Sequence, residues 1–315
     1  MLTGAVSSVL ALRSLYSASS LSLPASPHGM VHLLLFSGVQ APLQVRYSRP
    51  AKPKYDLPPL VHRALHTALD SKPASASYDA GADLLIIPRP GTLHKHSWDA
   101  CSLADYDVTV KIQIVNKGTA ASYAAEVSKA LQTLAEHKGL ELLDTVLVGL
   151  PKDEPASTWV EFWKTITSGE IKDVKNWGTL NLLEPILAEL VTIKAPVANE
   201  LNTTDCYTLP QDYTAFASSH RIQLWASGGG AGPDPLPAAD LHNLLHEFKS
   251  VLGGLVPAKS TPALSSIIPV AADGSSFCGQ AKPDVAVDWV VTYTLLSRTR
   301  NIVKDKGYIV SAESA

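Results

Sequence analysis

Short apolar runs alternate with segments of helical periodicity from Met30 to the end of this chain, and this alternation most constrains its fold. It is typical of α/β proteins, in which helices connect the strands of a mostly parallel sheet. The expected strands are residues 32–36, 84–87, 108–115, 145–150, a short run near 174, 197–201, 221–225 and 301–309. This number of strands approaches that of a closed (β/α)8 barrel.

The intervening segments have the periodicity of amphipathic helices. In residues 123–137, for example, Ala124, Val127, Leu131 and Leu134 fall on one stripe. Similar patterns predict helices at 159–166, 182–191, 212–219 and 238–252. Two stretches dense in Gly, Pro, Ser and Ala, 228–240 and 256–283, are expected to be mobile loops.

Composition restricts the class of protein further. The chain has 315 residues, 46% of them hydrophobic, which is enough for a large core. A formal net charge of -3 and scattered basic residues indicate no nucleic-acid partner. Three widely spaced cysteines, one of them Cys206, favour a reducing, cytoplasmic location over a disulfide framework. No apolar run has the length of a membrane-spanning helix. Residues 1–29 lack Asp and Glu and predict a disordered or wrongly included extension before a single domain at 30–315.

Metal and phosphate motifs are weak. His242 and His246 have the spacing of a helical zinc site, but no glutamate follows the first histidine and no third ligand is evident. The glycine run at 228–232 lacks the Lys-Ser/Thr that completes a phosphate-binding loop. The sequence therefore predicts no metal site.

A basic cluster near the C-terminus follows an apolar run. The order is Trp289-Val-Val-Thr-Tyr293, then Arg298-Thr-Arg-Asn-Ile-Val-Lys304-Asp-Lys306-Gly-Tyr308-Ile. Such a cluster is either a solvated surface or a site for an acidic partner.

This segment resembles the closing segment of the regulatory (modifier) subunits of glutamate–cysteine ligase, a branch of the aldo-keto reductase-like superfamily. Leu209-Pro-Gln-Asp-Tyr-Thr-Ala-Phe-Ala, followed by Ile222-Gln-Leu, resembles a helix and strand of the same family. The resemblance implies a single degraded barrel of the aldo-keto reductase type with long Gly/Pro-rich loops. It also implies a helix over 287–296, where Trp289, Tyr293 and Leu296 have helical spacing although the β-branched residues favour a strand.

The reductase catalytic set is incomplete in this chain. Lys111, in the middle of an expected strand, matches the reductase lysine, although a structural lysine paired with a carboxylate would explain it equally. Gly149 stands where the family's catalytic histidine is expected, and glycine cannot transfer a proton. Asn181 and Asn199-Glu200 echo cofactor-binding segments, but Ser227 replaces the tyrosine that stacks on nicotinamide. NADPH binding through Lys304 or Lys306 is therefore not expected.

The resemblance thus implies a non-catalytic subunit. It would bind the ligase's catalytic subunit as a heterodimer and alter its glutamate affinity and its feedback inhibition by glutathione. An NADPH-dependent aldo-keto reductase is the alternative. Cys206 is a candidate redox position, and the candidate partner contacts are Arg298, Arg300, Lys304, Lys306, Tyr308, Trp159, Phe162 and Trp163.

Overall fold

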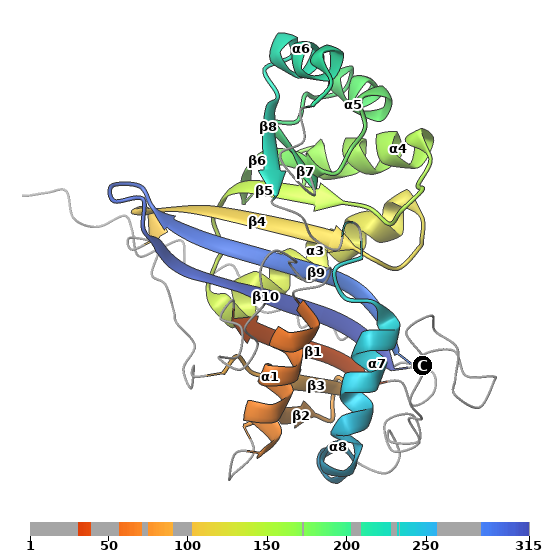
Figure 1. Cartoon of the computed structure of the whole chain (residues 1–315), viewed down its shortest axis with the longest axis vertical. Coiled ribbons are helices and arrows are strands. Elements are labelled where there is room, and N and C mark those ends of the chain that lie inside the picture. The colour runs from red at the N-terminus through yellow and green to blue at the C-terminus, as the bar shows by residue number, and fades with distance from the viewer. Residues whose placement is uncertain are drawn as a thin grey trace, which may run out of the picture.

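The computed structural model describes residues 31–38, 57–70, 75–90, 103–171, 173–202, 209–227, 232, 234–256 and 285–314. Within them, ten strands form one mixed sheet in the order β2-β3-β1-β10-β9-β4-β5-β6-β7-β8 (Figure 1). The strands are β1 (His32–Gly38), β2 (Ser77–Asp79), β3 (Leu84–Ile87), β4 (Tyr106–Ile114), β5 (Leu143–Gly149), β6 (Val174–Leu180), β7 (Ala198–Asn202), β8 (Gln223–Ser227), β9 (Val285–Ser297) and β10 (Val303–Ser314). The strands expected from the sequence are confirmed, with boundaries shifted by a few residues.

Seven helices are described alongside the sheet. They are α1 (Leu57–Asp70), α3 (Ala120–Lys138), α4 (Ala156–Thr167), α5 (Glu184–Val191), α6 (Gln211–Ser219), α7 (Ala238–Glu247) and α8 (Lys249–Leu255). Helix α3 has defined ends: the Thr119 side chain accepts from Ser122 N, and Gly139 takes the left-handed conformation. The single helix expected over 238–252 is instead two, because the chain leaves helical geometry at Phe248. Helix α1 was not predicted. Among the described helices, none combines the length and the apolar character that a membrane crossing requires.

The C-terminal hairpin of β9 and β10 corrects the sequence interpretation. Residues 287–296 are the middle of a strand, so the helix expected there is wrong. Residues four apart share a face in a strand as well as in a helix, so the spacing of Trp289 and Tyr293 did not discriminate. The β-branched residues, with both strand faces covered, decide for the strand.

The hairpin also changes the direction of the sheet. Strand β10 pairs antiparallel with β1, and β9 pairs antiparallel with β4. Since β9 and β10 are themselves antiparallel, β1 and β3 run opposite to the five parallel strands β4 to β8. The expected parallel sheet is confirmed within β4–β8 and between β1 and β3, and it fails at the hairpin. Closure into a barrel is not shown, since β2 and β8 lie at the two ends of the order among the described strands.

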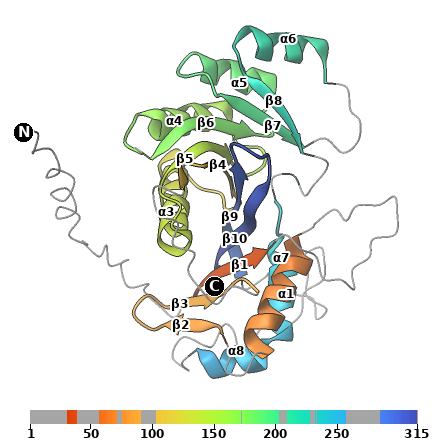
Figure 2. The ribbon, with the colours of Figure 1, turned by 90° about the vertical axis from the view of Figure 1, so that its left-hand side faces the viewer.

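Two cores lie on opposite faces of the hairpin. Helix α3 lies on one side of β9 and β10, and α1 with α7 lies on the other (Figure 2). Along β9, Trp289, Val291 and Tyr293 join the core that contains α3. Val287 and Val290 join the core that contains α1 and α7. The hairpin therefore stabilises both halves of the protein.

Candidate functional site

Lys111 lies in the middle of β4 and is held by a carboxylate from β7. Its Nζ lies 2.7 Å from Glu200 Oε1 and 2.6 Å from Oε2. The side chains are 34% and 10% exposed, respectively. These two contacts form a bidentate ion pair, and a structural lysine paired with a carboxylate is the alternative that the sequence had left open for Lys111.

The Gln113 side chain occupies the space beside Gly149, where the reductase resemblance implies a histidine. A Cβ added at Gly149 would lie 2.3 Å from Gln113 Oε1, closer than atoms can pack. The Gln113 amide cannot easily move, because its Nε2 donates to the carbonyls of Ile114 and Leu150 at 3.0 Å each. The buried Gln113 side chain therefore occupies the space that any side chain at residue 149 would need.

A buried amide connects the next strands to helix α6. Asn199 on β7 donates to the Leu182 carbonyl at 2.9 Å and contacts the Tyr213 hydroxyl at 2.5 Å, and its Oδ1 accepts from Thr179 Oγ1 at 2.9 Å. Burial raises the pKa of Tyr213, so its hydroxyl keeps its proton. All donors and acceptors of the amide are used within the protein, and Asn199 is therefore a structural residue.

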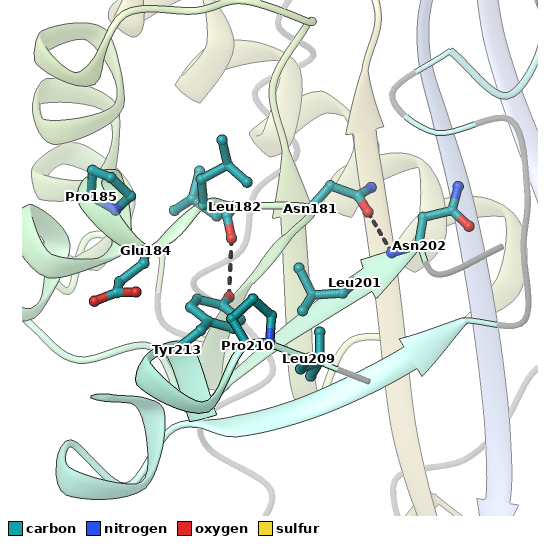
Figure 3. Close-up of a pocket in the computed structure, with 10 residues that line it drawn as sticks. Asn181, Leu182, Glu184, Pro185, Leu201, Asn202, Leu209, Pro210 and Tyr213 are labelled. Carbon is teal, nitrogen blue, oxygen red and sulfur yellow. Dashed lines mark hydrogen bonds between the residues drawn. The ribbon is translucent and has the colours of Figure 1, made fainter. Parts of the chain in front are cut away.

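A pocket of about 630 Å³ opens beside this amide, at the carboxyl ends of β6 and β7. Figure 3 shows the Tyr213 hydroxyl directed at the Leu182 carbonyl and the Asn181 amide directed at the backbone of Asn202. Asn181 has a φ of 55°, and its Oδ1 accepts from Asn202 N at 2.7 Å. Carboxyl ends of parallel strands are where α/β proteins commonly bind ligands. The lining is mainly apolar: Asn181, Leu182, Leu183, Glu184, Pro185, Leu201, Asn202, Leu209, Pro210 and Tyr213.

The basic cluster lies at the tip of the C-terminal hairpin, and its members differ in how far they are held by contacts within the protein. Arg298 donates to Asp144 Oδ1 at 2.6 Å and to the Ala104 carbonyl at 3.2 Å. Burial opposes ionisation of Asp144, but hydrogen bonds from Lys175, Val108 N and Arg298 outweigh it and lower the pKa of this carboxyl. Arg300 and Lys304 are exposed at the surface. Arg298 is thus a structural anchor.

Two further candidates on β10 are less exposed. Lys306 and Tyr308 are half-buried, and Tyr308 packs against the core that contains α1. Arg298 is also exposed but is held by Asp144, so Arg300 and Lys304 are the members of the cluster best placed to meet another molecule.

The three aromatic candidates on α4 lie inside the protein. Trp159 is almost fully buried, and Phe162 and Trp163 are fully buried. The Trp163 indole donates to the Lys194 carbonyl at 2.8 Å, which satisfies its one polar group internally. This corrects their assignment as partner contacts, because the hydrophobic stripe of α4 faces the core and not the surface.

The remaining candidates are few. Cys206 lies outside the described residues. His242 is buried on α7, and His246 is half-buried on the next turn. No group of three or more potential metal ligands was found among the described residues.

No protein-family model matches the chain. Curated proteins do. The human glutamate–cysteine ligase regulatory subunit is 28% identical over 218 residues, which is 65% of this chain and 66% of that protein. The mouse regulatory subunit is 27% identical over the same shares. A putative regulatory subunit from Schizosaccharomyces pombe is 27% identical over 169 residues, 52% of this chain and 47% of that protein.

The chain is similar to glutamate–cysteine ligase regulatory subunits. The match spans just under two thirds of the mammalian subunits' length. Among solved structures, an aldo-keto reductase from Brucella melitensis covers 52% of this chain and 69% of its own, at 19% identity and a TM-score of 0.31. The Bombyx mori aldo-keto reductase in complex with NADP covers 52% and 64%, at 17% identity and a TM-score of 0.30.

The sequence analysis considered a carboxylate partner for Lys111 but did not identify it as Glu200. Glu200 was noted only as an echo of a cofactor-binding pair. The available signal was its charge: an acidic residue on an interior-facing position of a strand needs a cation nearby, and Lys111 is such a cation. The signal for the pocket was weaker, since its lining comes from two strand ends and two helix starts that become neighbours only in the fold.

Proposed function

We propose that this chain is a non-catalytic regulatory subunit of a glutamate–cysteine ligase. It binds the catalytic subunit in a heterodimer, and this binding alters glutamate affinity and the feedback inhibition by glutathione. The main support is the similarity to regulatory subunits over 65% of the chain. A cytoplasmic location, as expected from the cysteine usage, is part of the same proposal.

The geometry around Lys111 supports the non-catalytic part of this proposal. General acid–base catalysis needs a side chain that can exchange a proton with the substrate at the operating pH. Here the ammonium is paired with both oxygens of Glu200, and Gln113 fills the space beside Gly149. Neither position offers a group free to transfer a proton.

A regulatory subunit must act through a difference in binding energy between two states of its partner. A coupling of about 1–3 kcal/mol changes an affinity by about 5- to 150-fold. The exposed side chains of Arg300 and Lys304 are the proposed contacts for an acidic surface of the catalytic subunit. Charged contacts at an exposed rim contribute mostly to association rate and are weakened by salt.

Co-purification with the cognate catalytic subunit tests the proposal directly. We expect a stable complex, with a lower KM for glutamate or weaker inhibition by glutathione than the catalytic subunit shows alone. Absence of both a complex and a kinetic effect would refute the regulatory assignment.

A charge-matched pair of variants tests the contact surface. Replacing Arg300 and Lys304 by Ala should slow association with the catalytic subunit, and added salt should reduce the difference from wild type. The control replaces the exposed Lys152 and Lys164, which lie elsewhere on the surface, by Ala and removes the same charge. Equal association rates for the two double variants would move the interface to another face.

An NADPH-dependent aldo-keto reductase is the second candidate. Two observations favour it: Lys111 matches the reductase lysine in sequence, and β4–β8 are five parallel strands. Closure of the sheet into a barrel remains a prediction. This candidate requires stoichiometric NADPH binding and aldehyde-dependent NADPH oxidation. Detection of both, together with no effect on the ligase, would establish it in place of the regulatory role.

A further inference from the structure

Exposed apolar side chains gather at the tip of the β9–β10 hairpin. Among the described residues, five large apolar side chains are exposed, and three of them lie at or beside this tip: Ile302 at 58%, Val303 at 52% and Leu142 at 49%. The other two, Leu183 and Val251, lie at the start of α5 and on α8. Single exposed apolar residues are ordinary, but several in one place indicate a contact surface.

Arg298 brings Leu142 and the tip to the same end of the sheet. Its side chain donates to Asp144 Oδ1 at 2.6 Å, and its backbone N donates to the Asp105 carbonyl at 3.0 Å. Asp144 follows Leu142 by two residues, at the start of β5, and Asp105 immediately precedes β4. Figure 1 shows the tip beside the beginning of β4. The exposed apolar group therefore lies at the amino ends of β4 and β5.

The apolar pair at the tip makes little contribution to the cores of the protein. Neither Ile302 nor Val303 belongs to either of the two cores or packs against one. Strand β1 pairs with β10 only from Gly307 onward, so residues 303–306 extend past the end of β1. The tip therefore projects from the sheet with its apolar pair in contact with water.

The two exposed cations flank this apolar pair in the sequence Arg300-Asn-Ile302-Val303-Lys304. A stable protein–protein interface has an apolar centre that is depleted of charge, surrounded by a polar rim. Ile302 and Val303 can provide such a centre, and Arg300 and Lys304 can provide the rim beside it. Removing the apolar pair from water would favour association, which exposed cations alone do only weakly.

We propose that Ile302 and Val303 insert into an apolar depression of the ligase's catalytic subunit, whose rim carries carboxylates that meet Arg300 and Lys304. This inference rests on the regulatory function proposed above and names the contact that holds the complex together. Charged contacts at a rim mainly accelerate association, whereas buried apolar contacts mainly slow dissociation. The cations and the apolar pair therefore have separable kinetic effects.

Binding kinetics between the full chain and the catalytic subunit test the apolar pair. Ile302→Thr and Val303→Thr keep the β-branched shape that suits a strand, and each should raise the dissociation rate about tenfold at both low and high salt. The association rate should change little, because no charge is removed. Val251→Thr, which makes the same change at an exposed valine on α8, is the matched control and should dissociate like the wild type.

The outcomes separate this inference from the regulatory function itself. Equal dissociation rates for the wild type, Ile302→Thr, Val303→Thr and Val251→Thr would overturn the apolar contact and leave the regulatory function standing. Absence of any complex with the wild type would overturn both. Self-association of the chain alone that Ile302→Thr abolishes would assign the tip to a second copy of this chain and overturn the proposal. Denaturation midpoints close to that of the wild type establish that each variant is folded.

Discussion

Replacing Asp288 by Asn should stabilise this protein, and the gain should depend on pH. Asp288 lies at an irregularity of the β9–β10 pairing, where its Oδ1 accepts from Asn116 Nδ2 at 2.9 Å and its Oδ2 from Ser311 Oγ at 3.1 Å. Burial, followed by the negative charges of Glu313 and Glu126, raises the pKa of Asp288 from 3.8 to about 6. These three effects outweigh the two hydrogen bonds, which favour the ionised form.

The shift predicts the size and the sign of the effect. A raised pKa means that folding favours the protonated carboxyl, so the contribution to stability is complete below pH 3.8 and is lost as the pH rises through about 6. A shift of about 2 units corresponds to about 3 kcal/mol above both values. Relaxation around the charge reduces this, and we expect about 2 kcal/mol.

An asparagine at this position can keep both hydrogen bonds while removing the charge. Its oxygen accepts from Asn116, and its amide donates to the Ser311 hydroxyl. The charge of Asp288 also helps to raise the pKa of His32 and of Lys129, so the substitution removes that smaller contribution as well. The difference between wild type and variant therefore reports on the charge of Asp288 together with its effect on these two neighbours.

Chemical denaturation at several pH values measures this difference. Asp288→Asn and wild type should have nearly equal free energies of unfolding at pH 4, and the variant should be more stable by about 2 kcal/mol at pH 8. Asp173→Asn, which makes the same change of charge at an exposed turn, is the matched control. A variant that is no more stable than wild type at pH 8 would refute the reasoning.

Three further substitutions test the interior of the β4–β8 sheet. Gly149→His should cost about 1–3 kcal/mol of unfolding free energy by overpacking against Gln113 and should yield no reductase activity; denaturation and NADPH oxidation assays check both outcomes. Asn199→Ala should cost about 2–3 kcal/mol, because it leaves several buried partners unsatisfied, and an unchanged denaturation midpoint would contradict the network. Lys111→Met should destabilise the protein by leaving the Glu200 carboxylate unpaired. The double variant Lys111→Met/Glu200→Leu should recover part of the loss in the same assay, and no recovery would argue against the ion pair.

Local patterns predicted the elements of this fold better than their connections. The apolar run Leu84–Ile87 is a strand with the same boundaries in the structure. Helix α1 was missed although Leu57, Leu60, Val61 and Ala64 have helical spacing and two prolines suit its first turn. The apolar spacing and the two prolines were therefore sufficient to predict this helix.

The order of strands could not be predicted from the sequence, for a physical reason. A run of βα units is compatible with one parallel barrel, and nothing local distinguishes it from a sheet interrupted by an antiparallel hairpin. Val290 and Tyr293 show the difficulty: their odd separation places them on opposite faces of a strand, but only the fold decides which core each face meets. The same limit applied to Trp159 and Trp163, whose aromatic character suits an interface or a core equally.

The hairpin tip connects the fold to the proposed function. The backbone N of Ser297 donates to the Ile302 carbonyl at 2.9 Å, and Asn301 closes the turn with a φ of 51°. Arg298 attaches this turn to β5 through Asp144. Arg300 and Lys304 therefore project from a turn whose backbone is already ordered, so a partner that binds them does not have to order the turn on binding. Loss of the Arg298–Asp144 contact should then weaken the complex without removing either exposed cation: Asp144→Asn should raise the dissociation rate from the catalytic subunit. An unchanged dissociation rate would mean that the anchoring of the tip does not contribute to the stability of the complex.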